Sequence, residues 1–225
     1  MIILHHDDLL KPDAIEKHLK FFSEHAELAL VGGQEDFIDK NGNITFLRDE
    51  KDIEIFKKGE ILEFIKQNGS YIPCSSVMFD MFKIREVGFF DDRYLATDEL
   101  FWSRVLQHFP IAILGSALIY RRIHSAQTEY DDFANKFDKI IEASKAQYQI
   151  ADYEKDLTRR NTTMLLIKKK LSRNCILIAY KVFQITKDFN LSLSYLKLAF
   201  LEYPQIFFSK FFLRFIFNTL FRKVD

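Results

Sequence analysis

The chain has 225 residues, of which 48% are hydrophobic and 28% charged, and its 32 Lys and Arg balance 32 Asp and Glu. This composition predicts a folded protein with a sizeable core, and only 7 Gly and 4 Pro argue against disorder. The two cysteines, Cys74 and Cys175, match no metal-ligand spacing, so we expect reduced thiols in a cytosolic setting. Residues 1–10 have no basic segment ahead of an apolar run, so we expect no secretory signal.

The zero net charge conceals an asymmetry. Residues 159–225 hold 13 Lys or Arg and 3 Asp or Glu, a net charge of +10, which leaves −10 for residues 1–158. The basic part also carries a long apolar run at residues 206–217, but Lys210 and Arg214 interrupt it before it is long enough to span a membrane. We therefore expect C-terminal helices that lie on an anionic membrane surface. The alternative is a helical subdomain that packs its apolar face on the rest of the chain.

A pair of adjacent carboxylates, Asp7 and Asp8, follows a short apolar run near the N-terminus. Residues 1–4 are typical of a central, buried parallel strand, and Pro12 predicts the first turn of a helix. The two carboxylates would then lie beyond the carboxyl end of a strand, where open α/β sheets bind ligands. They favour a divalent cation, Mg²⁺ or Mn²⁺, which would keep positions open for substrate phosphates. The alternative is a solvated acidic turn that caps the helix.

The rest of the chain predicts an α/β protein. Asn41-Gly42 favours a hairpin turn within residues 37–46, because both residues adopt positive φ easily. Thr97 would cap a helix that stops before Pro110. Further expected elements are strands at 27–31, 75–79 and 111–123, a helix at 60–67, and helices from about residue 130 onward.

A second group of motifs lies in the middle of the chain. It comprises Val87-Gly88-Phe89-Phe90-Asp91-Asp92-Arg93-Tyr94, then Thr97-Asp98-Glu99-Leu100-Phe101-Trp102-Ser103-Arg104, then Tyr120-Arg121-Arg122-Ile123-His124. These segments resemble the acceptor-side signature of the inverting glycosyltransferase family 2. That family carries a "vGxFDexy" segment, an acidic pair that leads into a helix with Trp and Arg, and a closing "yRxH" stretch. The Asp7-Asp8 segment resembles its DxD-type metal site, and the motifs occur in the family's order.

The resemblance covers about residues 1–130 and implies part of a GT-A fold. Members of the family begin with a nucleotide-binding βαβ unit of roughly a hundred residues, comparable to a small domain, ahead of the metal motif. The sequence before the metal motif here is too short for that unit. We therefore expect residues 1–128 to be the C-terminal portion of a GT-A catalytic domain and residues 129–225 to be a helical, basic, apolar-rich extension. The chain would be truncated or one piece of a split enzyme.

The resemblance also implies an activity. A sugar would pass from a nucleotide-diphospho-sugar donor to a cell-surface polysaccharide or glycolipid acceptor, at the cytoplasmic face of the membrane. Asp98 would be the catalytic base, while Asp7 and Asp8 would hold the Mn²⁺ or Mg²⁺ that stabilises the leaving diphosphate. From the residues alone, Asp98 is equally an ordinary first-turn acid stabilised by the helix dipole, and Trp102 suits a core position. The residues expected to bind substrate are His6, Glu99, Trp102, Arg104, Arg122 and His124.

The chain departs from the family pattern at two positions. Thr97 stands where the family usually has Glu, and His5 stands where it more often has Asp. A non-catalytic remnant, or the partner subunit of a split transferase that takes its nucleotide-binding half from another chain, is the main alternative. A metal-dependent phosphohydrolase is less favoured, because that class places its His-Asp pair on a helix. We expect no nucleic-acid binding, since the basic residues alternate with lipid-suited Phe instead of forming a stacking platform.

Overall fold

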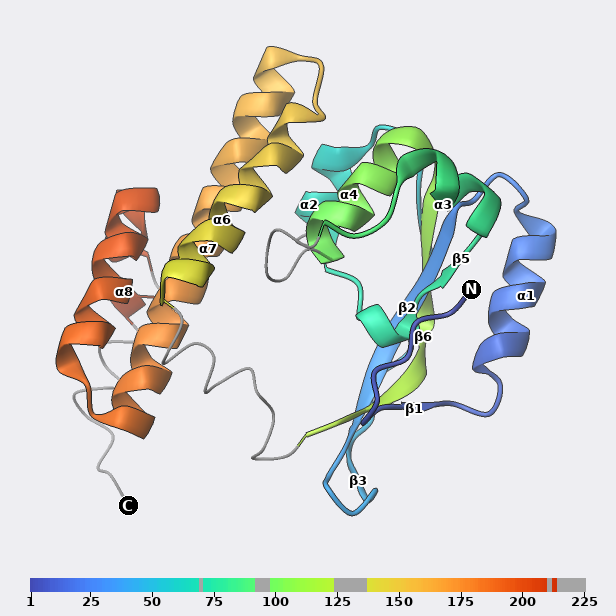
Figure 1. Ribbon diagram of the computed structural model, residues 1–225, viewed down its shortest axis with the longest axis horizontal. Helices are drawn as coiled ribbons and strands as arrows, with labels where there is room; N and C mark the ends of the chain where they lie inside the picture. The colour runs from blue at the N-terminus through green and yellow to red at the C-terminus, as the bar shows by residue number, and fades with distance from the viewer. Residues whose placement is uncertain (69–70, 92–97, 124–136, 210–211, 214–225) are drawn as a thin grey trace.

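Two long parallel strands, β2 (Leu30–Ile38) and β6 (Ile111–Arg122), form the centre of the fold in the computed structural model (Figure 1). The structure describes residues 1–68, 71–91, 98–123, 137–209 and 212–213. The two strands pair from Leu30 opposite Ile111 to Ile38 opposite Arg122, with irregular register around Gln34. Their first halves are apolar and buried, as expected for strands covered on both faces.

Short antiparallel strands complete the sheet on both sides. β1 (Leu9–Leu10) and β4 (Glu54–Phe56) pair with β6, whereas β3 (Ile44–Phe46) and β5 (Met78–Phe79) pair with β2. Among the described residues the sheet therefore has six strands and is mixed. The α/β class predicted from the sequence is confirmed at this level.

Residues 1–4 do not form the central parallel strand that their apolar character predicted. Ile2 makes one antiparallel bridge with Met78, on the side of β5 that faces away from β2. Met1 and Leu4 are 52% and 45% exposed. Apolar content alone does not distinguish a central strand from an edge segment, because the difference lies in whether a neighbour covers the outer side.

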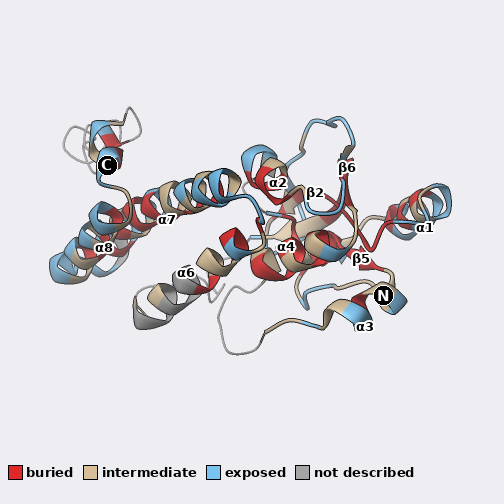
Figure 2. Ribbon diagram, turned by 90° about the horizontal axis from the view of Figure 1, so that it is seen from above, coloured by how far each residue is buried: buried red, intermediate tan, exposed pale blue. Residues whose placement is uncertain are grey.

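Helices cover both faces of the sheet (Figure 2). α1 (Ala14–Glu24) packs Ala14 and Phe21 on one face, against Val31 and Ala112. The opposite face meets α2 (Ile61–Asn68), α4 (Asp98–His108) and the short α3 (Met81–Val87) through a larger core. Neighbouring residues of β2 alternate between these two cores, which is the two-residue period of a strand.

Three further helices form an arm beside the sheet: α6 (Phe137–Asp152), α7 (Leu157–Thr186) and α8 (Phe189–Glu202), followed by the turn η2 (Pro204–Phe208) (Figure 1). The first half of α7 contributes Ile167 and Leu171 to the core that lies under α4. Its second half contributes Cys175 and Ile176 to a separate core with α8. In the parts of the chain that the structure describes, no helix is both long and apolar enough to cross a bilayer.

Several elements match their sequence predictions, and one is shorter. The helix predicted at residues 60–67 is α2, and the predicted hairpin has its turn at Gly42, which adopts a φ of +90°. The strand predicted at 75–79 is reduced to β5, because the Ser76 N–H bonds back to the Pro73 carbonyl at 2.9 Å and curls the chain into the turn η1 (Cys74–Ser76). The capping position Thr97 lies outside the described residues.

A glycine on β6 is required where another segment crosses the strand. The Lys51 N–H donates to the Gly115 carbonyl at 3.2 Å, and a Cβ on Gly115 would lie 1.7 Å from the Lys51 carbonyl oxygen.

We expect Gly115→Ala to lower the free energy of unfolding by about 3 kcal/mol, because the backbone at Lys51 must move to make room for the new Cβ. Gly42 has open space around an added Cβ but a φ of +90°, so Gly42→Ala should lower the free energy of unfolding by only about 1 kcal/mol. Denaturant titration of both variants checks this, and equal losses would contradict it.

Candidate functional site

Asp8 anchors the N-terminal loop to two distant parts of the chain. Its side chain is only 5% exposed, and its two oxygens accept from the Ser75 hydroxyl at 2.6 Å and from the Arg122 backbone N–H at 3.1 Å. The His5 N–H donates to the same Ser75 hydroxyl at 3.2 Å, and the His5 Nδ1 lies 3.8 Å from the Asp8 carboxylate. Asp8 therefore joins the loop to η1 and to the carboxyl end of β6.

Asp7 has a different environment from its neighbour. Its side chain is 20% exposed and lies 3.9 Å from Nδ1 of His6, whose own side chain is almost fully in solvent. The backbone carbonyl of Asp7 accepts from Nε of Arg122 at 2.9 Å, and Nη1 of Arg122 also donates to the Asp39 carbonyl at 3.0 Å. Arg122 thus holds the loop against the β2–β3 hairpin, while the Asp7 carboxylate keeps contact with solvent.

The second acidic pair, Asp98 and Glu99, lies at the start of α4. Burial raises the pKa of Asp98, although the Glu99 N–H donates to its Oδ1 at 3.0 Å and the positive charges of Lys170 and His5 act in the opposite direction. Glu99 pairs with Lys170 at 2.5 Å, and Lys170 comes from the middle of α7. A helix of the arm therefore reaches the start of α4.

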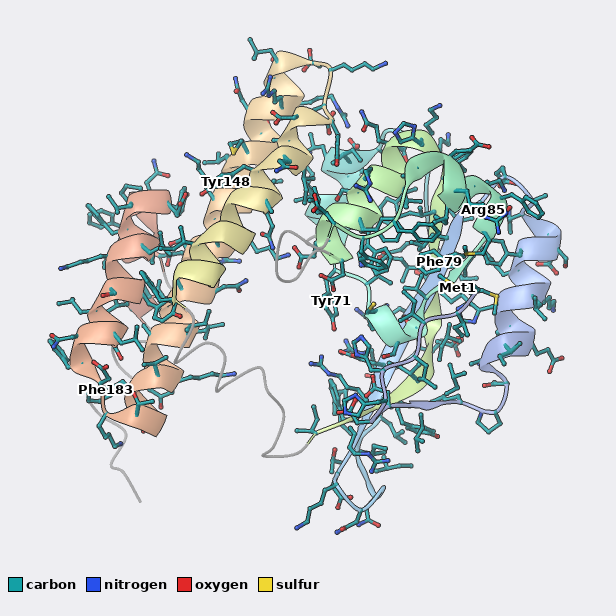
Figure 3. All side chains as sticks on the ribbon, viewed as in Figure 1. Met1, Tyr71, Phe79, Arg85, Tyr148 and Phe183 are labelled. Atoms are coloured by element: carbon teal, nitrogen blue, oxygen red, sulfur yellow. The ribbon has the colours of Figure 1, made fainter. Side chains whose placement is uncertain are left out.

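The structure brings the two acidic pairs to the same end of the sheet, around η1. Burial raises the pKa of Cys74 to about 12, and the negative charge of Asp98 contributes to that rise. Cys74 directly precedes Ser75, the partner of Asp8. Tyr71, which lies between the sheet and the arm in Figure 3, also has its pKa raised, first by burial and then by Glu35 and Asp98.

Two buried acids of β2, Glu35 and Asp36, add to this end of the sheet and were missed by the sequence predictions. Burial raises the pKa of Glu35, against the charge of Arg121 at 3.6 Å, and the Tyr71 hydroxyl donates to it at 3.3 Å. Asp36 pairs with Lys11 at 2.5 Å. The signal that could have revealed them is a pair of acids within an otherwise apolar strand.

The other predicted substrate-binding residues lie in different surroundings. Trp102 has no exposed surface and packs its ring against Phe79 and Phe90, so it fills the core. Arg104 lies over the Phe101 ring and donates to the Phe89 carbonyl. His124 lies outside the described residues.

A divalent cation such as Mg²⁺ needs several oxygen ligands. Among the residues that the structure describes, no group of three or more His, Cys, Asp or Glu side chains is arranged to hold a metal ion. Mg²⁺, however, is commonly held by one or two carboxylates together with substrate phosphates. The Asp7 side chain is partly exposed and the Asp8 side chain is buried, so of the two carboxylates Asp7 is the one that an ion in solution can reach. The described carboxylates alone therefore do not complete a cation site, and an ion bound here would need further oxygen ligands.

No protein-family model and no curated protein sequence matches this chain.

The different environments of Asp7 and Asp8 predict different costs of substitution. Asp8→Ala leaves the Ser75 hydroxyl and the Arg122 N–H without their acceptor, so we expect the free energy of unfolding to fall by about 3 kcal/mol. Asp7→Ala is the matched control and should cost less than about 1 kcal/mol, because its carboxylate is partly exposed. Denaturant titration measures both, and a small loss in the Asp8 variant would show that it is not the anchor.

The raised pKa of Asp98 predicts that replacing this residue increases the free energy of unfolding in a pH-dependent way. The folded state binds the Asp98 proton more tightly than the unfolded state, whose pKa is near 3.8, so its ionisation costs stability as pH rises through the folded pKa. We expect Asp98→Asn to unfold at higher denaturant than the native chain at pH 7, and this gain to vanish below pH 3.8. Glu99→Gln is the control: it breaks the ion pair with Lys170 and should show no gain.

If Asp98→Asn is no more stable than the native chain at pH 7, the ionised Asp98 side chain does not destabilise the folded state. Denaturant titration followed by circular dichroism at several pH values measures this difference.

Proposed function

We propose that the chain is the acceptor-side part of an inverting, family 2-like glycosyltransferase. It would serve the transfer of a sugar from a nucleotide-diphospho-sugar to a saccharide or glycolipid acceptor at the cytoplasmic face of a membrane. The observation that carries the proposal is the meeting of two acidic pairs, Asp7-Asp8 and Asp98-Glu99, around the turn η1. They are about 90 residues apart in the sequence, and they are the two acidic sites that the resemblance requires.

The chemistry assigns separate tasks to the two pairs. In inverting transfer the acceptor oxygen bonds to the anomeric carbon while the bond from that carbon to the diphosphate breaks, and a carboxylate takes the proton of the acceptor hydroxyl. Asp98 suits the base, because burial raises its pKa and so strengthens it as a proton acceptor. A bound Mg²⁺ or Mn²⁺ would neutralise the leaving diphosphate, and Asp7 is the carboxylate that suits it.

The contacts of Glu99 and Arg122 support positioning roles for both. Glu99 is held by Lys170, which fixes the first turn of α4 and with it Asp98. Arg122 holds the backbone of Asp7 through its guanidinium and the Asp8 carboxylate through its N–H. His6 lies beside Asp7 with its ring in solvent, where it can donate to a phosphate.

A second candidate is the partner subunit of a split transferase, and the edge of the sheet favours it. Ile2 bridges to Met78 on the outer side of β5, and Met1 and Leu4 are exposed on the same segment. Exposed sheet edges are sites where a strand of another chain adds by main-chain hydrogen bonds. The nucleotide-binding half would then come from that chain, and this chain would supply the acceptor side.

The proposal predicts that two substitutions separate binding from turnover. Asp7→Asn should weaken Mn²⁺-dependent binding of a nucleoside diphosphate at least about tenfold, because it removes a charged ligand. Asp98→Asn should leave that affinity nearly unchanged and lower turnover by about 10²- to 10⁴-fold in the complete enzyme, as expected for a general base. Asp13→Asn, an exposed acid shortly after the same loop, is the control.

Titration calorimetry with UDP and with GDP, with and without Mn²⁺, measures the affinities. Unchanged binding in Asp7→Asn would remove Asp7 from the cation site, and near-normal turnover in Asp98→Asn would remove Asp98 as the base. Binding that occurs only in the presence of a second chain would select the split-enzyme candidate.

A further inference from the structure

Helix α8 presents an apolar stripe to solvent. Its opposite face is buried on α7, with Tyr195 and Ala199 fully covered. The outward face carries four exposed apolar side chains, and their exposed fractions range from 36% to 75%: Phe189, Leu193, Phe200 and Leu201. In Figure 2 exposed segments of α8 alternate with covered ones, as expected for a helix with one buried face. Outward helix faces of globular proteins are usually polar or charged, so this face is suited to a partner.

The stripe continues into an apolar groove between α8 and η2. The groove has a volume of about 910 Å³, and its walls include Leu196, Phe200 and Phe207. Phe208 lies at its margin and is 89% exposed. Lys197 is the charged side chain in the described lining, and its ammonium group can reach outward past the apolar walls. The surface therefore combines an apolar groove with one lysine in its lining.

The C-terminal part of the arm, residues 157–213, is strongly basic, whereas α6 has a net charge of −1. Residues 157–213 contain 10 Lys or Arg and 2 Asp or Glu, a net charge of +8. Both acids accept hydrogen bonds within the fold: Asp188 caps α8 by accepting from the Leu191 N–H, and Glu202 accepts from the Tyr148 hydroxyl. Beyond α8, residues 203–224 contain 4 Lys or Arg, 7 Phe and no acid. Such a field attracts anionic surfaces within a Debye length of about 8–10 Å.

We propose that the surface formed by the outward face of α8 and by η2 docks onto an anionic lipid bilayer. The Phe and Leu side chains of the stripe enter the acyl boundary, and basic residues beside the stripe, such as Lys197, meet anionic head groups. A purely apolar protein partner would cover the stripe but would offer no anionic groups to the net positive charge of residues 157–213. This inference is independent of the transferase proposal, because it rests on α8, η2 and the charge of the arm alone.

Co-sedimentation of the full chain with vesicles tests the proposal. At low salt we expect binding to phosphatidylcholine vesicles that contain phosphatidylglycerol, and at least about tenfold weaker binding to phosphatidylcholine alone. The double variant Phe200→Ser, Leu201→Ser should bind the anionic vesicles at least about tenfold more weakly, because two apolar side chains no longer enter the bilayer. The matched control is Leu19→Ser, Phe82→Ser, which makes the same changes at exposed positions of α1 and α3.

Each outcome of this experiment decides the proposal. Loss of binding in the stripe variant, with binding intact in the control variant and equal thermal stability in both, supports it. Equal binding of the stripe variant overturns it, since the basic residues alone would then suffice. Absence of binding by the native chain also overturns it, and a dimer that sedimentation velocity finds in the native chain but not in the stripe variant would assign the surface to a second copy. None of these results affects the nucleotide-binding test.

Discussion

The parallel pairing of β2 with β6 is the constraint on which the rest of the structure depends. Its register places the apolar residues of both strands alternately in the two cores, and a slip of one residue would exchange the faces. The same register brings the end of β6 to the N-terminal loop, where the Arg122 N–H meets Asp8. It also sets Arg121 near Glu35 on the neighbouring strand. Core packing and the acidic end of the sheet thus have a common origin.

Local signals in the sequence predicted the elements that depend on local physics. The turn at Asn41-Gly42, the helix α2 and the strand β6 follow from turn chemistry and apolar runs, and they form where expected. The prediction of a central strand at residues 1–4 was wrong, because apolar residues suit both an edge strand and a central strand. The two differ only in whether another strand pairs on the outer side. The predicted strand at 27–31 overlaps β2 only at Leu30 and Val31, and β2 continues to Ile38 through two acids whose partners, Lys11 and Arg121, are not close in sequence.

The candidate site shows a similar division. The sequence identified the acids by their motifs, but it treated Asp7 and Asp8 alike, and only burial distinguishes an anchored carboxylate from a partly exposed one. The partners that decide the environment, Ser75 for Asp8 and Lys170 for Glu99, are 67 and 71 residues away along the chain. Contacts across such separations arise from the fold, and composition carries no signal for them. The family assignment accordingly stays a proposal.

Helix α7 belongs to two cores at once, with Ile167 and Leu171 in one and Cys175 and Ile176 in the other. Its 30 residues form a helix about 45 Å long, and Lys170, which forms an ion pair with Glu99, lies near its middle. One continuous helix therefore carries residues of both cores and the partner of Glu99, so we expect a substitution that shifts α7 in one core to disturb the packing of the other.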